Sequence, residues 1–97
     1  MIYHITTAKE WKVAQEQGFY EAASLATEGF IHNSTENQVA GVLQRYFDGK
    51  TDLVKLVIDP AKLTHELKYE LAPSLGEEFP HIYGPINLDA VVDVVRL

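Results

Sequence analysis

The stretch Gly29-Phe30-Ile31-His32-Asn33-Ser34-Thr35-Glu36-Asn37-Gln38 decides how this chain folds. Phe30 and Ile31 are residues that favour a strand. The polar residues that follow them are typical of the start of a helix. The stretch therefore predicts a short buried strand that runs directly into a helix, with polar side chains at the junction.

The helix predicted after this strand carries both a start signal and an apolar stripe. Ser34 or Thr35 can cap its first turn, and Thr35-x-x-Gln38 matches a capping box. The N–H groups and the positive dipole end at such a start suit an anion, so we expect a phosphate group beside His32 or Ser34. Hydrophobic residues recur at helical spacing, which predicts a face buried against a sheet: Val39, Val42, Leu43, Tyr46 and Phe47.

The remaining patterns predict one more helix and several strands. In order, they are a strand over residues 2–5, a helix from the capping box Thr7-x-x-Glu10 to Gln17, a short strand or extended loop over 19–23, a turn over 24–29, a central strand over 53–58, a half-exposed strand over 63–71, a short strand over 81–83 and a final strand over 90–97. Pro80 and Pro85 flank the short strand, and prolines at these positions favour a strand at the edge of a sheet.

This order places two helices early in the chain and most strands late. It predicts an α+β fold with a split, mostly antiparallel curved sheet. A length of 97 residues is typical of a single domain, here residues 1–97.

Composition narrows the class of protein. The formal net charge is −6, which argues against a nucleic-acid partner, because phosphate backbones require a basic surface. A small anionic ligand needs only a few local donors and remains compatible with this charge. The chain has no cysteine, which excludes disulfides and thiolate sites. No apolar run approaches the ~18 residues of a membrane span, and no signal peptide is evident, so we expect no membrane partner and a cytoplasmic location.

Three short stretches place polar side chains together on predicted strand faces. These pairs are His4 with Thr6, His32 with Ser34, and His81 with Tyr83, and Glu70 lies on a fourth strand. A site assembled from distant strands would have this pattern, and so would ordinary core histidines with a solvated glutamate. The sequence does not separate these two interpretations.

The same residue types also occur in two other kinds of site. His4, His32 and His81 match the number of ligands in a catalytic zinc site, although the chain has no local ligand spacing such as His-x-x-x-His. A Ser-His-acid triad is weaker, because the chain contains no Gly-x-Ser-x-Gly elbow.

The motifs together resemble a known family. Tyr3-His4-Ile5-Thr6, Glu28-Gly29-Phe30-Ile31-His32-x-Ser34, Tyr69-Glu70 and Phe79-Pro80-His81-Ile82-Tyr83-Gly84-Pro85 occur in the order found in the domain of unknown function 952 family. The fold of this family resembles that of the ADP-ribosyltransferases, and its His-bearing strands resemble those of the RNA 2'-phosphotransferases in that superfamily. The resemblance implies a nucleotide ligand, with NAD as the cofactor.

The resemblance also implies roles for individual residues. His4 would hold a ribose and Ser34 would supply the hydroxyl of a second motif, with Glu70 or His81 as the catalytic group. A pocket built this way would also contain Thr6, His32 and Tyr83 as nucleotide-binding residues. The implied activity is transfer at the nicotinamide–ribose bond. The alternatives are a noncatalytic small-molecule binding module and, more weakly, a His-based metal-dependent hydrolase. The oligomeric state is left open.

Overall fold

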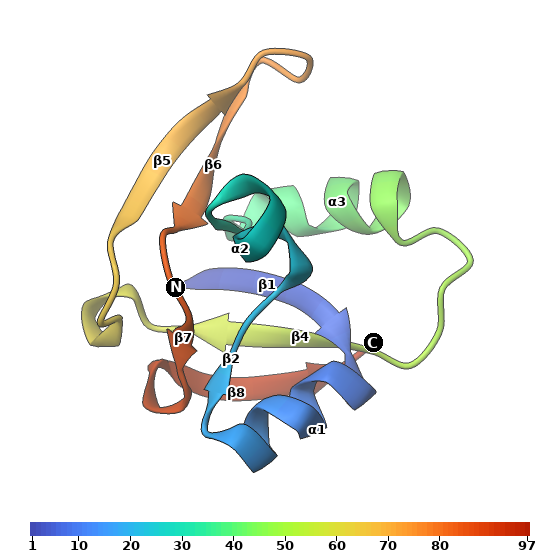
Figure 1. Ribbon diagram of the computed structural model, residues 1–97. Coiled ribbons are helices and arrows are strands. Elements are labelled where there is room, and N and C mark those ends of the chain that lie inside the picture. Colours follow the sequence, from blue (N-terminus) through green and yellow to red (C-terminus); the bar gives the residue numbers. More distant parts are fainter.

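Eight strands form three small antiparallel sheets in the computed structural model, which describes residues 1–97 (Figure 1). The first sheet has the order β1-β4-β8 and contains β1 (Ile2–Thr7), β4 (Leu53–Ile58) and β8 (Val91–Arg96). The second pairs β2 (Phe19–Tyr20) with β7 (Ile86–Asn87). The third has the order β3-β6-β5 and contains β3 (Ile31–His32), β6 (Glu77–Ile82) and β5 (Leu67–Ala72). The prediction of an antiparallel α+β fold is confirmed.

A single bridge connects the first and third sheets. Tyr3 of β1 exchanges two backbone hydrogen bonds with Ser34, each 2.8 Å long, just after β3 ends. Beyond this bridge the two sheets diverge, because the chain after Ser34 enters a 3₁₀ turn (Glu36–Gln38) and then α3 (Val39–Tyr46). The divergence leaves one edge of β1 without a neighbouring strand.

The hydrophobic core lies around β4, which is the middle strand of the first sheet. Leu56 and Ile58 of β4 are fully buried, and so are Ile31, Ile82 and Ile86 from the other two sheets. The nearly continuous apolar pattern of residues 53–58 predicted this central position correctly. Burial of these side chains is the main stabilising contribution to the fold.

The helix α1 (Ala8–Gln17) begins and ends where its capping residues predict. The hydroxyl of Thr7 accepts a hydrogen bond from the Glu10 N–H at 3.1 Å. Gly18 follows the helix with φ of 95°, a left-handed conformation that glycine adopts without steric cost. The same logic explains an element that the sequence analysis missed. Residues 23–28 form the short helix α2 (Ala23–Glu28) where a turn was expected, and Gly29 ends it with φ of 87°.

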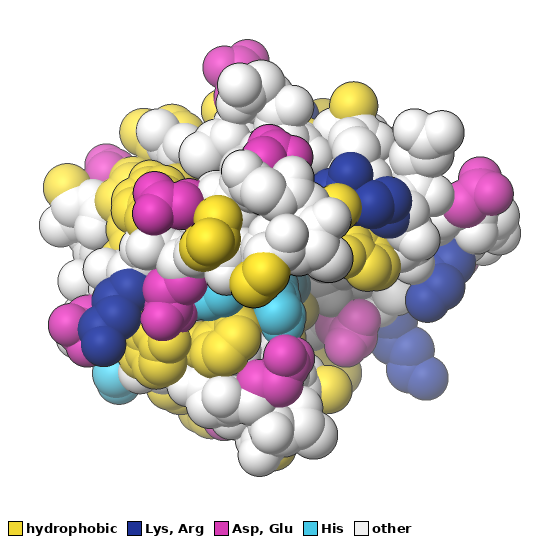
Figure 2. All heavy atoms as spheres, turned by 90° about the horizontal axis from the view of Figure 1, so that it is seen from above, with side chains coloured by type: hydrophobic (Ala, Val, Ile, Leu, Met, Phe, Trp, Pro, Cys, Tyr) yellow, Lys and Arg dark blue, Asp and Glu magenta, His cyan; other side chains and the backbone are white.

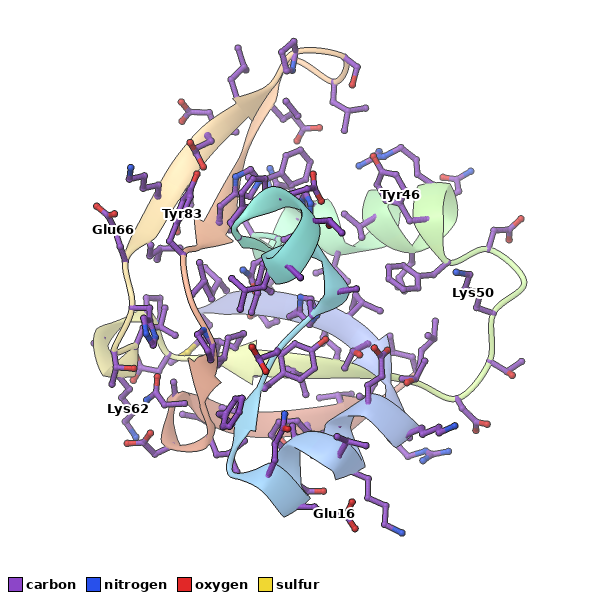
Figure 3. The ribbon with its side chains drawn as sticks, in the orientation of Figure 1. Glu16, Tyr46, Lys50, Lys62, Glu66 and Tyr83 are labelled. Carbon is purple, nitrogen blue, oxygen red and sulfur yellow. The ribbon has the colours of Figure 1, made fainter.

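The apolar stripe on α3 is not buried against a sheet, so that prediction is wrong. None of the five residues in the stripe is fully buried, and Tyr46 is 59% exposed. Figure 1 shows α3 standing apart from β4 and β8, and Figure 3 shows Tyr46 on this helix. Val42, Tyr46 and Phe47 of the stripe instead line a cavity.

Two strand predictions in the second half of the chain need correction. Residues 63–66 are not in a strand, and β5 starts only at Leu67. In place of the predicted short edge strand over 81–83, residues 81 and 82 form the end of β6, which is the middle strand of its sheet and contains Pro80, and Tyr83 lies outside the strand. The proline is tolerated because its missing N–H would point towards β3, and β3 has already ended at that level.

Candidate functional site

A cavity of about 510 Å³ lies where the first and third sheets diverge. This volume is within the range of small-molecule sites in proteins. Its walls come from the edge of β1, the start of α2, the end of β3, the apolar stripe of α3 and the far half of the β5–β6 hairpin. The lining is mostly apolar, and it includes Tyr3, Ile5, Val42, Tyr46, Phe47 and Phe79.

The polar part of the lining has a negative rather than a positive character. It contains Glu10 and the three predicted histidines, and it contains no lysine or arginine. On the face shown in Figure 2, acidic side chains lie beside the histidines. A diphosphate group would therefore find no cationic side chain inside the cavity.

His4, His32 and His81 all line this one cavity, so the structure brings together the three histidines that the sequence singled out. They do not form a metal site. No group of three His, Asp or Glu side chains is arranged to hold a metal ion. Each histidine instead has its own partner, which gives each ring a different chemical role.

His4 lies on the cavity floor with both ring nitrogens engaged. Its Nδ1 is 2.6 Å from the carbonyl oxygen of His32, so Nδ1 carries the proton and donates. Its Nε2 is 2.7 Å from the hydroxyl of Tyr20, which must then donate to it. Burial lowers the pKa of His4 from 6.5 to about 4, and burial also raises the pKa of Tyr20 to about 12. In this arrangement His4 has no free nitrogen for the ribose that the resemblance assigned to it.

His32 and His81 stand opposite each other across the β3–β6 pairing. Cross-strand partners place their side chains on the same face, and the two ring centroids are 5.2 Å apart. Phe30 stacks on His81 with the ring centroids 4.0 Å apart. His32 Nε2 contacts the Glu28 carboxylate at 2.8 Å. The pair is therefore fixed by packing on one side and by acidic partners on the other.

Glu70 lies behind His81 and does not line the cavity. His81 Nδ1 donates to Glu70 Oε1 at 2.8 Å, and the Tyr83 hydroxyl donates to the same oxygen. These hydrogen bonds, that of Tyr83 first, lower the pKa of the Glu70 carboxyl, and the contact raises the pKa of Tyr83. Because Nδ1 holds a proton, the Nε2 of neutral His81 is the basic atom.

This arrangement gives His81 and Glu70, the two candidates for the catalytic group, different positions relative to the cavity. His81 lines the cavity and can contact a ligand, whereas Glu70 and Tyr83 orient it from behind. Tyr83 does not line the cavity, and its predicted role in ligand binding stays a prediction.

Thr6 and Glu10 form a second polar pair at the cavity wall. Thr6 is almost fully buried, and its hydroxyl donates to Glu10 Oε1 at 2.9 Å. The hydroxyl of Thr7 donates to the same oxygen at 3.1 Å. Glu10 Oε2 is left free beside the cavity. The sequence analysis treated Glu10 only as part of a capping box, and no local signal distinguishes the two roles.

The edge of β1 presents backbone groups to the cavity. The N–H and the C=O of Tyr3 both hydrogen-bond to the backbone of Ser34, so neither group bonds to β4. Ile5 lies two residues further along and has the same orientation, with its N–H and C=O directed away from β4. No strand pairs with it on that side, since the pairing ends at Ser34. Ile5 therefore offers an adjacent donor and acceptor to whatever occupies the cavity.

The start of the third helix is a poorer anion site than the sequence predicted. The N–H of Asn33 is bonded to Pro80, and that of Ser34 to Tyr3. The N–H of Thr35 is capped by the side chain of Gln38 at 3.0 Å, as the capping box predicted. These three donors are already used, so an anion here would have to bind to the N–H groups that follow them or to the side chains of His32 and Ser34. The predicted phosphate beside His32 or Ser34 stays a prediction.

Comparison with known proteins identifies relatives of this structure. The chain matches the family described as Protein of unknown function (DUF952) over residues 5–94. It is 34% identical to protein CC0527 from Caulobacter crescentus, whose crystal structure superposes with a TM-score of 0.88 and covers 97% of this chain and 82% of that chain. The solution structure of CC0527 gives a TM-score of 0.84 at 34% identity, covering 99% of this chain and 83% of that chain.

No curated protein matches the chain. None of the helices has the length and hydrophobicity needed to cross a bilayer. The match over residues 5–94, together with a similar structure at 34% identity, shows that this chain belongs to the DUF952 family.

Proposed function

We propose that the cavity binds the nicotinamide end of NAD or of a related ADP-ribose nucleotide. The observation that carries the proposal is the unpaired N–H and C=O of Ile5 at the cavity edge. A carboxamide has one donor and one acceptor side by side, so it can pair with these two groups as a neighbouring strand would. The apolar walls from Phe47 and Phe79 suit the faces of an aromatic ring.

The divided sheet supports the same proposal. The sequence resemblance implies a fold like that of the ADP-ribosyltransferases, in which NAD lies in a split sheet. The cavity here lies at the point where β1 and β3 separate. The lining contains Glu10 and no lysine or arginine, which favours binding of the nicotinamide–ribose part inside the cavity. The nicotinamide ring is electron-poor when it is attached to ribose, so a nearby carboxylate stabilises it. The diphosphate would then lie at the mouth, in contact with solvent.

If transfer occurs at the nicotinamide–ribose bond, two groups are placed to assist. Glu10 offers a free carboxylate oxygen that would stabilise positive charge developing on the ribose. His81, oriented by Glu70, offers a basic nitrogen to accept a proton from the incoming group. Both act by positioning and electrostatics.

The second candidate function is noncatalytic binding in the same cavity. It is favoured by His4, whose two nitrogens are held by Tyr20 and by the backbone of His32. Release of free nicotinamide from NAD, measured over hours with the wild-type protein, distinguishes the two functions. Binding without release supports the noncatalytic function.

The carboxamide contact predicts a strong discrimination between matched ligands. Nicotinic acid adenine dinucleotide differs from NAD by a carboxylate in place of the carboxamide. It has no donor for the Ile5 carbonyl and adds a charge beside Glu10, so we expect it to bind about tenfold more weakly or worse. Isothermal titration calorimetry with both ligands, and with ADP-ribose, makes the comparison. Equal affinity for all three would show that the nicotinamide is not recognised and would remove the proposal.

Ser34 and Thr35 allow the binding and stability effects to be separated. Ser34 hydrogen-bonds to Tyr3 through its backbone, which leaves its hydroxyl available at the cavity. We expect Ser34→Ala to weaken NAD binding while the melting temperature of the free protein stays nearly unchanged. Thr35 is the capping residue, so Thr35→Ala should lower the unfolding free energy by about 1 kcal/mol without affecting binding. The reverse pattern would show that Ser34 is structural.

A further inference from the structure

The outer edge of β5 is an unpaired strand edge with an apolar face. β5 is the last strand in the order β3-β6-β5 and runs for six residues without a bulge or an internal proline. Tyr69 is 50% exposed and Leu71 is 59% exposed on it. Proteins usually block such an edge with proline, a bulge, charged side chains or a covering loop. The edge here has no proline, bulge or covering loop, and its two charged side chains, Lys68 and Glu70, have opposite signs.

The hydrogen bonds around β6 show which residues of β5 point outward. Pro80 accepts from the Asn33 N–H at 3.0 Å, so its carbonyl faces β3 and cannot bond to Tyr69. Glu66 accepts from the Tyr83 N–H at 2.8 Å, so Glu66 faces β6. Backbone direction alternates along a strand. Leu67, Tyr69 and Leu71 therefore direct their N–H and C=O groups away from the sheet.

We propose that β5 pairs antiparallel with β5 of a second copy of this chain, with the two-fold axis at Tyr69. A symmetric pairing places one residue of β5 opposite its own counterpart, and the axis can lie at any residue from Leu67 to Leu71. An axis at Lys68 or at Glu70 would place two like charges directly opposite each other, which is destabilising. An axis at Leu71 would place Tyr69 opposite Pro73, which has no N–H. An axis at Leu67 would use residues before β5 that form no strand. Only the axis at Tyr69 pairs residues 67–71 of both copies.

The side chains are complementary in this register. Lys68 lies opposite the partner subunit's Glu70, and the symmetry repeats this pair on the other side of the axis. These are positions without backbone hydrogen bonds, where side chains of opposing strands come closest. Leu67 lies opposite the partner subunit's Leu71, and Tyr69 opposite the partner subunit's Tyr69. The apolar residues form one continuous face, and no like charges face each other.

The groups needed for this ion pair are available. Lys68 contacts Glu66 at 3.8 Å, but both side chains are about half exposed, and such a pair contributes little. His81 and Tyr83 both donate to Oε1 of Glu70, which leaves Oε2 for the partner subunit's Lys68. Figure 3 shows Glu66 pointing outward at the start of β5, beyond the paired segment. Because Glu70 also orients His81, the dimer would add a cation next to the carboxylate that supports the cavity.

Sedimentation equilibrium between micromolar and millimolar protein tests the association. We expect wild type to approach twice the chain mass of 10.9 kDa as concentration rises. Lys68→Glu should shift it to monomer, because two Glu–Glu pairs replace two Lys–Glu pairs. Lys62→Glu makes the same charge change in the 3₁₀ turn before β5 and should leave the dimer intact. A wild type that stays monomeric throughout, or a dimer that Lys68→Glu does not weaken, overturns the proposal.

Crosslinking tests the register independently of affinity. The chain has no cysteine, so a single introduced cysteine can form only an intermolecular disulfide. In Tyr69→Cys the two Cα atoms would be about 5.5 Å apart, within the range of a disulfide. In Leu71→Cys they would be about 14 Å apart, since each cysteine is displaced by four residues along the strand from its counterpart on the neighbouring strand. Rapid oxidation of Tyr69→Cys alone supports the axis at Tyr69. Preferential oxidation of Leu71→Cys, or none in either variant, overturns it.

Discussion

Replacing Leu56 with alanine should lower the unfolding free energy by about 2–5 kcal/mol, the range found for such truncations in well-packed cores. Leu56 is fully buried in β4 and lies between His4 of β1 and Val94 of β8 in the sheet register. The neighbouring strands are held by backbone hydrogen bonds and cannot collapse easily into the space. Urea unfolding, followed by the fluorescence of the single Trp11 and by circular dichroism, measures the loss.

Leu43→Ala is the matched control for this prediction. It removes the same atoms from α3, where Leu43 is only half buried. We expect a loss less than half of that for Leu56→Ala, because less apolar surface leaves water at this position. Equal losses in the two variants would contradict the placement of α3 as a cavity wall and would restore it to the core.

Local signals were sufficient for the elements whose ends carry capping residues. The Thr7 cap and Gly18 defined α1 correctly, and the apolar run Leu53–Ile58 identified the central strand. These features depend on neighbours in sequence, which the sequence shows directly. The same holds for the capping box of Thr35 and Gln38, whose hydrogen bond is present in the structure.

Other features depend on what lies opposite an element, which the sequence does not show. The stripe on α3 has the spacing of a core-facing helix, but a ligand cavity requires the same apolar residues as a core. Pro80 suggested an edge strand, yet β6 is a middle strand because its neighbour β3 is only two residues long. Periodicity identifies an apolar face without identifying what covers it.

In the candidate site too, some features follow from local sequence signals and others depend on what lies opposite each residue in the fold. The motifs indicated His32 and His81 because both lie beside apolar strand residues, and the strand register brings them face to face. The role of Glu70 behind His81 follows from the β5–β6 register, and the place of Glu10 follows from the packing of α1 beside β1. Neither arrangement leaves a pattern in the sequence.

Acidification should destabilise this protein through His4 before its carboxylates are protonated. The pKa of His4 is about 4 in the folded protein and 6.5 in its ordinary state, so the unfolded chain binds more protons between these two values. Stability therefore rises with pH across this window. The contribution of His4 is complete above pH 6.5 and is lost as the pH falls to 4. A shift of this size corresponds to roughly 3 kcal/mol.

Urea unfolding at intervals from pH 7 to pH 4 measures this dependence, and two variants assign it. His4→Gln removes the titrating group, so its stability should change less with pH than that of wild type, even if it is less stable at pH 7. His65→Gln removes an exposed histidine and should keep the wild-type slope. The physical reason is burial, which lowers the pKa of His4 because the charged ring loses its hydration in the folded protein. A protonated His4 also cannot accept the hydrogen bond from Tyr20, so charging the ring breaks a contact on the cavity floor. If His4→Gln retains the full wild-type slope, His4 is already able to accept a proton in the folded state, and its assignment as a neutral, buried acceptor is wrong.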